Sequence, residues 1–284
     1  SRILRSLRVH EHKIFVDWDE WYGHGGLFTV GFQAYAPMAS LLTFLEQRVP
    51  LYADAVTVSG GALRQRALWA GVKPENLFLI KTGADVDFIK PLDIYETREK
   101  LGLPLKNVIY SHVGFIDMES LKLLMLAHRQ VVKHHSNALL MFVGLDKSQA
   151  EFVKSLDTTG NILFVEWQPY HKYVLYIGAS DILLLPMQDN FFNRTRPLAL
   201  RLGDYIAAGR PIITTELPEI AKALSECALL AKPNPEDFAS KILKAIRDPD
   251  LRRELGKRAR ELAETEFSWK IRAKTLERIY HQYL

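Results

Sequence analysis

The chain has 284 residues, of which 48% are hydrophobic and 25% are charged, as is usual for a soluble globular protein of more than one domain. Its net charge of +4 suits an anionic small molecule or a membrane surface, but it is far weaker than that of a dedicated nucleic-acid-binding protein. We therefore expect no nucleic-acid partner. The one cysteine, Cys227, excludes an internal disulfide and a cysteine-based metal cluster.

No apolar run approaches the roughly 18 residues that are needed to span a bilayer, and the start of the chain lacks the apolar core of a signal peptide. A cytoplasmic location is therefore expected, and the basic charge leaves association with a membrane surface as an addition to it. Residues 1–12 form a basic segment with no strand before it. We expect that something upstream was removed or that a first half-domain lies elsewhere.

A short strand is predicted at residues 13–16, followed by an acidic, aromatic and glycine-rich loop. This arrangement is typical of the ligand-facing edge of an open α/β sheet. Two acids here have the spacing of a metal-binding pair, although hydrogen bonding within a tight turn is the preferred interpretation. The aromatic residues either offer flat faces to a sugar acceptor or pack against their own domain. The residues of this predicted acceptor side are Asp17, Trp18, Asp19, Trp21, Tyr22 and His24.

Helices and strands alternate strictly through most of the chain, which predicts parallel sheets with helical crossovers. The charged segment 91–106, which contains two prolines, is predicted to be an interdomain linker. Ligands are expected at the carboxyl ends of the strands of the second, doubly wound sheet. The predicted strands are 54–59, 77–80, 107–114, 138–143, 162–165, 182–185, 212–215 and 228–230. The predicted helices are 37–49, 60–70, 118–134, 147–156, 170–179, 197–208, 218–225, 235–246, 249–265 and a last one that ends near 280.

The helix predicted after Pro197 carries charges that suggest a binding site. Arg194 and Arg196 are placed where the unpaired N–H groups of a helix start already favour an anion. Asp204 follows roughly 10 Å further along the helix axis, where its carboxylate can accept two hydroxyls, such as those of a ribose. The alternative is that the arginines form surface salt bridges, with Arg201 to Asp204 at i,i+3 as one pair.

The run Asp204-Tyr205-Ile206-Ala207-Ala208-Gly209-Arg210-Pro211 resembles the Glu-Ala-Met-Ala-x-Gly-x-Pro run of retaining, glycogen-synthase-like GT-B glycosyltransferases, the group 1 glycosyl transferases. Residues 83–85 and 267–269 also resemble this family, at the end of its first domain and of its chain. The resemblance implies an α/β fold with two Rossmann-like, doubly wound domains, of which the first is incomplete. It implies boundaries at 1–94 and 95–265, with a C-terminal helix at 266–284 that crosses back to the first domain.

The resemblance also implies the roles of individual residues. In the family, the acid that opens the run binds the nucleotide ribose, and the glycine after the first strand of the second domain lets the donor diphosphate approach. Residues after the third strand lie near the nucleobase, although a packing tryptophan is an equal alternative there. The family needs no metal in this domain and no cofactor besides the nucleotide-sugar substrate. The predicted donor site comprises Gly114, Glu166, Trp167, Asn193, Arg194, Arg196, Arg201 and Asp204.

The chain departs from the family pattern at two places in this site. Arg196 stands where the family has a glutamate that contacts the donor sugar, and a basic pair is missing after Gly114. The other arginines would then have to neutralise a diphosphate from across the pocket, or the site is weakened. The glycine-rich loop and the histidine that the family's opening strands supply are not found, so no catalytic base is predicted.

Three interpretations of function follow. The first is a retaining, metal-independent glycosyltransferase of the hexosyltransferase type, which transfers a sugar from a nucleotide-sugar donor to a glycan or lipid-linked acceptor in polysaccharide biosynthesis. The second is a degenerate, non-catalytic module that binds a glycan, a nucleotide or a partner protein. The third is a split enzyme whose first half-domain is a separate chain.

Overall fold

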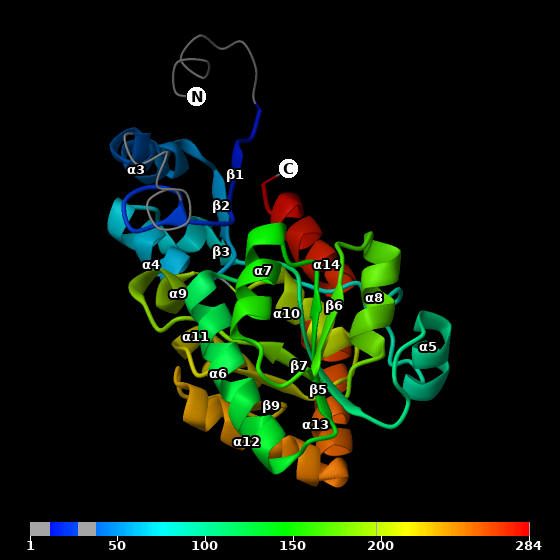
Figure 1. Cartoon of the computed structure of the whole chain (residues 1–284). Helices are drawn as coiled ribbons and strands as arrows, with labels where there is room; N and C mark the ends of the chain where they lie inside the picture. The colour runs from blue at the N-terminus through cyan, green and yellow to red at the C-terminus, as the bar shows by residue number, and fades with distance from the viewer. Residues whose placement is uncertain (1–11, 28–37, 197, 284) are drawn as a thin grey trace. The chain divides into compact units, whose positions relative to one another are not determined.

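The computed structural model describes residues 12–27, 38–196 and 198–283, and Figure 1 shows its helices and strands. The chain forms two compact units. Unit 1 consists of Ser1–Gly83, Asn190–Ala199 and Trp269–Leu284, and unit 2 consists of Ala84–Asp189 and Leu200–Ser268. The first break thus falls before residue 94, and a short piece of the predicted second domain groups with unit 1.

Unit 1 is built on a parallel sheet in which β1 (Phe15–Trp18) pairs with β2 (Ala55–Val58) and β2 pairs with β3 (Leu77–Leu79). One face of the sheet packs against α4 (Gly61–Ala70) through a core that includes Trp18 and Leu63. On the other face, the Phe15 ring meets the Tyr280 ring of α14 (Trp269–His281) at a centroid distance of 4.6 Å. The remaining helices of the unit are α3 (Ala39–Arg48), η2 (Val49–Tyr52), η3 (Pro74–Asn76) and α9 (Phe191–Thr195).

Unit 2 contains a six-stranded, fully parallel sheet in the order β6-β5-β4-β7-β8-β9. The order reverses between β4 and β7, so crossovers leave the sheet in opposite directions there. In such sheets ligands bind outside the carboxyl ends of the strands at this reversal. The strands are β4 (Val108–Val113), β5 (Ala138–Val143), β6 (Ile162–Val165), β7 (Ile182–Leu185), β8 (Ile212–Thr215) and β9 (Ala228–Ala231).

Helices cover the sheet of unit 2. In Figure 1, α6 and α12 run side by side, and they contribute to one core cluster together with residues of α7 and the sheet. In the same unit, α10 packs against α13, and α5 packs against α8. The helices are α5 (Ile94–Leu101), α6 (Met118–His134), α7 (Lys147–Leu156), α8 (Tyr170–Gly178), α10 (Leu200–Ala207), α11 (Pro218–Leu224), α12 (Pro235–Arg247), α13 (Pro249–Leu262) and the π-helical η4 (Ala263–Phe267).

Side-chain caps explain why several helices begin where the sequence predicts. The carboxylate of Asp117 accepts the Ser120 N–H at the start of α6. Asp146 and Gln149 form a reciprocal capping box at the start of α7. Each cap satisfies an N–H group that the helix itself leaves unpaired.

Two predictions of local structure are wrong. The segment 91–106 is not an open linker, because Asp93 caps α5 within it and the helix packs in unit 2. The predicted helices do not include residues 191–195, which form α9 with Asn190 as its cap. The following helix, α10, begins at Leu200, and Pro197, where its start was predicted, lies outside the described residues. Arg194 therefore occupies the last turn of a short helix rather than the start of a long one.

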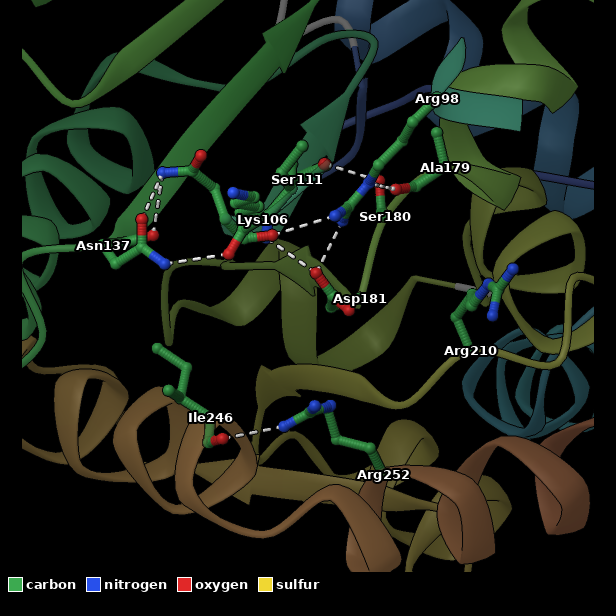
Figure 2. A network of polar contacts seen from close by, with 12 residues as sticks. Arg98, Lys106, Ser111, Asn137, Ala179, Ser180, Asp181, Arg210, Ile246 and Arg252 are labelled. Carbon is green, nitrogen blue, oxygen red and sulfur yellow. Dashed lines mark hydrogen bonds and ion pairs between the residues drawn. The ribbon is translucent and has the colours of Figure 1, made fainter. Parts of the chain in front are cut away.

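A buried arginine ties α5 to the sheet of unit 2 (Figure 2). The side chain of Arg98 is 2% exposed and donates to the Asp181 carboxylate at 2.6 Å. It also donates to the Ala179 and Asn107 carbonyls, both at 2.8 Å. Asp181 in turn accepts the Ile109 N–H at 2.8 Å. The amino ends of β4 and β7, the two strands at the reversal, are thereby held together.

Two general features concern the described residues only. None of their helices is both long and apolar enough to cross a bilayer. They also contain no cluster of three or more histidine, cysteine, aspartate or glutamate side chains that could hold a metal ion.

We expect Arg98→Ala to lower the free energy of unfolding by about 3–5 kcal/mol, because it leaves the Asp181 carboxylate, whose side chain is only 15% exposed, without its partner. Arg253→Ala is the control, because it breaks an exposed ion pair with Asp250 and should cost less than about 1 kcal/mol. Urea unfolding of both variants measures the difference. Equal losses would contradict a structural role for the Arg98 network.

Candidate functional site

The carboxyl ends of β4 and β5 both lead into a glycine in the left-handed region. Gly114 has φ +86° and Gly144 has φ +83°, a backbone conformation that few other residues adopt. The Gly114 N–H donates to the Val143 carbonyl at 2.8 Å, and the Gly144 N–H donates to the Val165 carbonyl at 2.9 Å. A Cβ at Gly144 would lie 3.8 Å from Cα of Trp167 and 3.9 Å from Cα of Gly114. The ends of three neighbouring strands therefore lie close together.

Arg201, on α10, places its guanidinium beside the end of β4. A Cβ at Gly114 would lie 3.3 Å from its Nη2 atom. Nη1 donates to Nε2 of His112 at 3.0 Å. The ion pairs among the described residues do not include Arg201, so the expected i,i+3 pair with Asp204 is not formed. The site thus holds a cation that has no carboxylate partner in the described part of the chain.

His112 is buried on β4 and is held as a neutral base. Its Nδ1 atom lies 3.0 Å from the Leu184 carbonyl, and its Nε2 atom lies 3.0 Å from Nη1 of Arg201 and 3.2 Å from the Phe115 carbonyl. Because a guanidinium only donates, Nε2 accepts from Arg201 and Nδ1 carries the proton. Burial, aided by the nearby charge of Arg201, lowers the pKa of His112 to about 3. The imidazole therefore orients Arg201 without adding a second positive charge.

Asp204 lies one turn after Arg201 on α10 and binds hydroxyls rather than a cation. Its Oδ2 accepts the Tyr173 hydroxyl at 3.1 Å, and its Oδ1 accepts the Tyr170 hydroxyl at 3.4 Å. Burial raises the pKa of Asp204 to about 6, although the two tyrosine hydroxyls and Arg201 act in the opposite direction. The carboxylate is thus poorly solvated and set up to accept hydroxyl groups.

Tyr205 fixes the helix that carries both charged groups. It is fully buried, and its hydroxyl oxygen accepts the Val113 N–H at 3.0 Å. This bond joins the middle of α10 to the last residue of β4. Arg201 and Asp204 therefore keep their places relative to Gly114.

The sequence did not single out the aromatic residues next to Asp204. The rings of Phe88 and Tyr170 are stacked at 5.5 Å with an interplanar angle of 17°, and those of Tyr170 and Tyr173 at 5.8 Å with an angle of 16°. Phe88 is 48% exposed and Tyr170 is 49% exposed. The i,i+3 spacing of the two tyrosines at the start of a predicted helix was the available signal. A histidine inside the apolar strand 107–114 was the corresponding signal for His112.

The other predicted donor-site residues are divided between the two units. Glu166 and Trp167 follow β6 in unit 2 and are exposed, Trp167 to 76%. Asn193, Arg194 and Arg196 belong to unit 1. The helix that was predicted to start at Pro197 begins at Leu200, four residues after Arg196, and Arg194 belongs to α9. The roles of these five residues in donor binding stay predictions.

Arg196 has a neighbour that the sequence did not indicate. Its guanidinium lies 3.9 Å from the Glu20 carboxylate and 5.1 Å from the centre of the Phe192 ring. Burial raises the pKa of Glu20, and Arg196 partly offsets this. The reversed charge at position 196 is thus matched by an acid within unit 1.

The residues of the predicted acceptor side have different surroundings in unit 1. Trp18 is 5% exposed and Trp21 is 6% exposed, so the prediction that these indoles offer open faces is wrong. Both join the core between the sheet and α4, and the guanidinium of Arg66 lies 4.2 Å from the Trp21 ring centre.

The polar residues of that loop make contacts within unit 1. Asp17 accepts the Thr57 hydroxyl at 2.5 Å, Asp19 accepts the Tyr22 hydroxyl at 3.4 Å, and Nε2 of His24 lies 2.8 Å from the Ser40 hydroxyl. Only the Asp19 contact lies within the loop, because Asp17 is on β1 and its partner Thr57 is on β2. An acceptor role for Asp17, Asp19, Tyr22 and His24 stays a prediction.

Residues 93–262 match the family described as "Glycosyl transferases group 1", and this range is more than half of the chain. The protein belongs to the group 1 glycosyl transferases. The matched range contains β4 to β9, and with them Gly114, Arg201 and Asp204.

Curated relatives match over part of their length. The chain is 26% identical over 199 residues to spore coat protein SA of Bacillus subtilis, covering 66% of this chain and 52% of the relative. It is 25% identical over 218 residues to D-inositol 3-phosphate glycosyltransferase of Corynebacterium jeikeium, covering 72% of this chain and 51% of the relative. The chain spans about half the length of the curated relatives that it matches.

A solved structure confirms the fold. The Anabaena protein HepE, crystallised with UDP and glucose, matches with a TM-score of 0.72 at 14% identity, covering 95% of this chain and 72% of HepE. The predicted α/β, GT-B-like fold is therefore correct.

The raised pKa of Asp204 predicts a pH-dependent loss of stability. The folded value of about 6 lies above the ordinary value of about 3.9, so the charged carboxylate destabilises the fold above pH 6, and this effect disappears as the pH falls towards 4. We expect Asp204→Asn to be more stable than the parent at pH 7.5 by about 1–3 kcal/mol, with the gain lost near pH 4.5.

Urea unfolding of the parent and variant at both pH values measures this effect. Asp250→Asn, which removes an exposed carboxylate, controls for the loss of one charge. A variant that is less stable than the parent at pH 7.5 would show that the charged carboxylate supports the fold.

Proposed function

We propose that this chain is the donor-binding, larger part of a glycosyltransferase that moves a sugar from a nucleotide-sugar donor to a glycan or lipid-linked acceptor. One observation carries the proposal: a guanidinium without a carboxylate partner among the described residues stands beside Gly114, one helical turn from a hydroxyl-accepting carboxylate. Membership of the group 1 glycosyl transferases supports it. The name of the Corynebacterium relative and the ligands of HepE are consistent with it.

The two charged groups suit the two polar parts of a nucleoside diphosphate. Arg201 binds the diphosphate through paired N–H donors, and Gly114 leaves the approach open because it has no side chain. Asp204, about 5 Å further along α10, accepts the hydroxyls of the ribose. Trp167, exposed after β6, is the candidate to stack on the base.

The site would promote sugar transfer by electrostatic stabilisation of the leaving diphosphate. Negative charge develops on the diphosphate as the sugar leaves, and the fixed guanidinium of Arg201 stabilises it. No metal or other cofactor is part of this proposal. The resemblance of residues 204–211 to retaining enzymes supports retention of the anomeric configuration. The reaction would serve polysaccharide synthesis in the cytoplasm.

A second candidate function is a non-catalytic nucleotide- or glycan-binding module. The residues after Gly114 favour it, because Phe115-Ile116-Asp117 provides no cation for the diphosphate. Binding of a nucleotide without any transfer, in the presence of all its partner chains, would select this alternative.

Unit 1 exposes apolar side chains that support a further partner. Leu41, Phe44, Leu45 and Val49 on α3 and η2 are between 42% and 56% exposed. Such a patch favours contact with another surface, and we propose a separate chain that completes the first domain. A membrane surface is the alternative. Co-purification from the native cell and sedimentation with anionic vesicles distinguish the two.

Calorimetric titration tests the donor site. We expect uridine or guanosine diphosphate to bind the parent chain and Asp204→Ala to bind it at least tenfold more weakly. Arg201→Ala should weaken the binding of the nucleoside diphosphate to a similar extent. It should leave the weak binding of the free nucleoside almost unchanged, because only the diphosphate needs the cation. Asp204→Ala should weaken the binding of both the nucleoside diphosphate and the free nucleoside.

Arg253→Ala is the matched arginine control, since it is exposed on α13. No binding of either nucleoside diphosphate to the parent chain would overturn the proposed function.

A further inference from the structure

The two tyrosines that bind Asp204 are not equivalent. Tyr173 donates to Oδ2 at 3.1 Å from a side chain that is partly buried, and burial raises its pKa above the usual range. Tyr170, the first residue of α8, donates to Oδ1 at 3.4 Å and is 49% exposed. The Tyr170 bond is therefore the longer of the two and the more accessible to water.

Release of the two hydroxyls would have different costs. A hydroxyl at an exposed position exchanges its partner for water at little net cost, whereas one withdrawn from solvent loses a bond that water replaces poorly. Tyr170 can thus leave Asp204 easily, and Tyr173 cannot. The ring of Tyr170 is the middle one of the aromatic stack, between those of Phe88 and Tyr173, so the difference between the two tyrosines concerns their hydroxyls.

Asp204 has capacity for further hydroxyl donors. A carboxylate has about four acceptor positions, and the two tyrosine hydroxyls use two of those of Asp204. The charged groups that face it are Arg201, whose Nη1 atom donates to His112, and Asp85, which repels it. An incoming hydroxyl at Oδ1 would therefore be bound by an oxygen that is short of donors.

We propose that Tyr170 is an exchangeable cap on Asp204: a ligand hydroxyl takes its place at Oδ1, while Tyr173 keeps the carboxylate oriented through Oδ2. The inference rests on the proposed function, because the ligand class is a vicinal diol such as the ribose of a nucleoside diphosphate. Without a ligand, the cap supplies a donor to the half-buried carboxylate.

The cap determines how strongly the site distinguishes a diol from a ligand that lacks one. A ligand without ribose hydroxyls leaves Tyr170 in place, so Oδ1 keeps its hydrogen bond. The parent chain therefore gains less from the diol than a chain without the Tyr170 hydroxyl does. When Tyr170 cannot donate, Oδ1 is satisfied only by the ligand, and the preference for the diol increases.

The experiment compares the parent with Tyr170→Phe and with the matched variant Tyr173→Phe, both of which keep the ring. Calorimetric titration with uridine diphosphate and 2′,3′-dideoxyuridine diphosphate measures the ratio of their affinities, and the guanosine pair replaces them if only guanosine diphosphate binds. We expect Tyr170→Phe to raise the ratio by about three- to tenfold. Tyr173→Phe should lower it, because the carboxylate loses the donor that orients it.

The outcomes separate the cap from the proposed function. A ratio that Tyr170→Phe leaves unchanged, or an equal loss of affinity for both nucleotides, overturns the cap and leaves the nucleotide site standing. Failure of the parent to bind any nucleotide overturns the proposed function and the cap with it. A raised ratio in Tyr170→Phe together with a lowered one in Tyr173→Phe supports both.

Discussion

The parallel sheet of unit 2 is the constraint on which the rest of the site depends. Its order reverses between β4 and β7, so the crossovers on either side diverge and leave the carboxyl ends of these strands open. Arg98 and Asp181 hold the amino ends of the same two strands. At the opposite end, β4 leads into Gly114, beside the Arg201 side chain that α10 delivers. A bond from Tyr205 to the end of β4 sets the position of that helix.

The site keeps two opposite charges on one helix from neutralising each other. Arg201 and Asp204 are three residues apart, a spacing at which an arginine and an aspartate readily pair. Here a neutral imidazole accepts from the guanidinium, and two tyrosine hydroxyls donate to the carboxylate. Both charges therefore stay available for a ligand. The cost appears as the raised pKa of Asp204, since a paired carboxylate would titrate lower.

Much of the fold could be predicted because it depends on local patterns. The strands and helices between 118 and 185 follow from apolar runs, glycines and capping acids, and α6, α7, β5, β6 and β7 have the predicted boundaries. The prediction failed where a helix cap starts a helix in a segment whose composition suggested none. Charged residues and prolines suggested a linker at 91–106, but Asp93 starts a helix there whose Arg98 is buried. Asn190 similarly starts α9, which moved Arg194 away from the start of a long helix.

The sequence by itself determined the fold class, the family and the candidate roles of Gly114 and Asp204, because short motifs and the alternation of elements are local properties. Only the tertiary structure decided the partners of these residues. His112 and Tyr173 lie 89 and 31 residues from the side chains that they contact, and no local pattern specifies such a pairing. The fold likewise decided that Trp18 and Trp21 are core residues, since burial depends on which face of the sheet α4 covers.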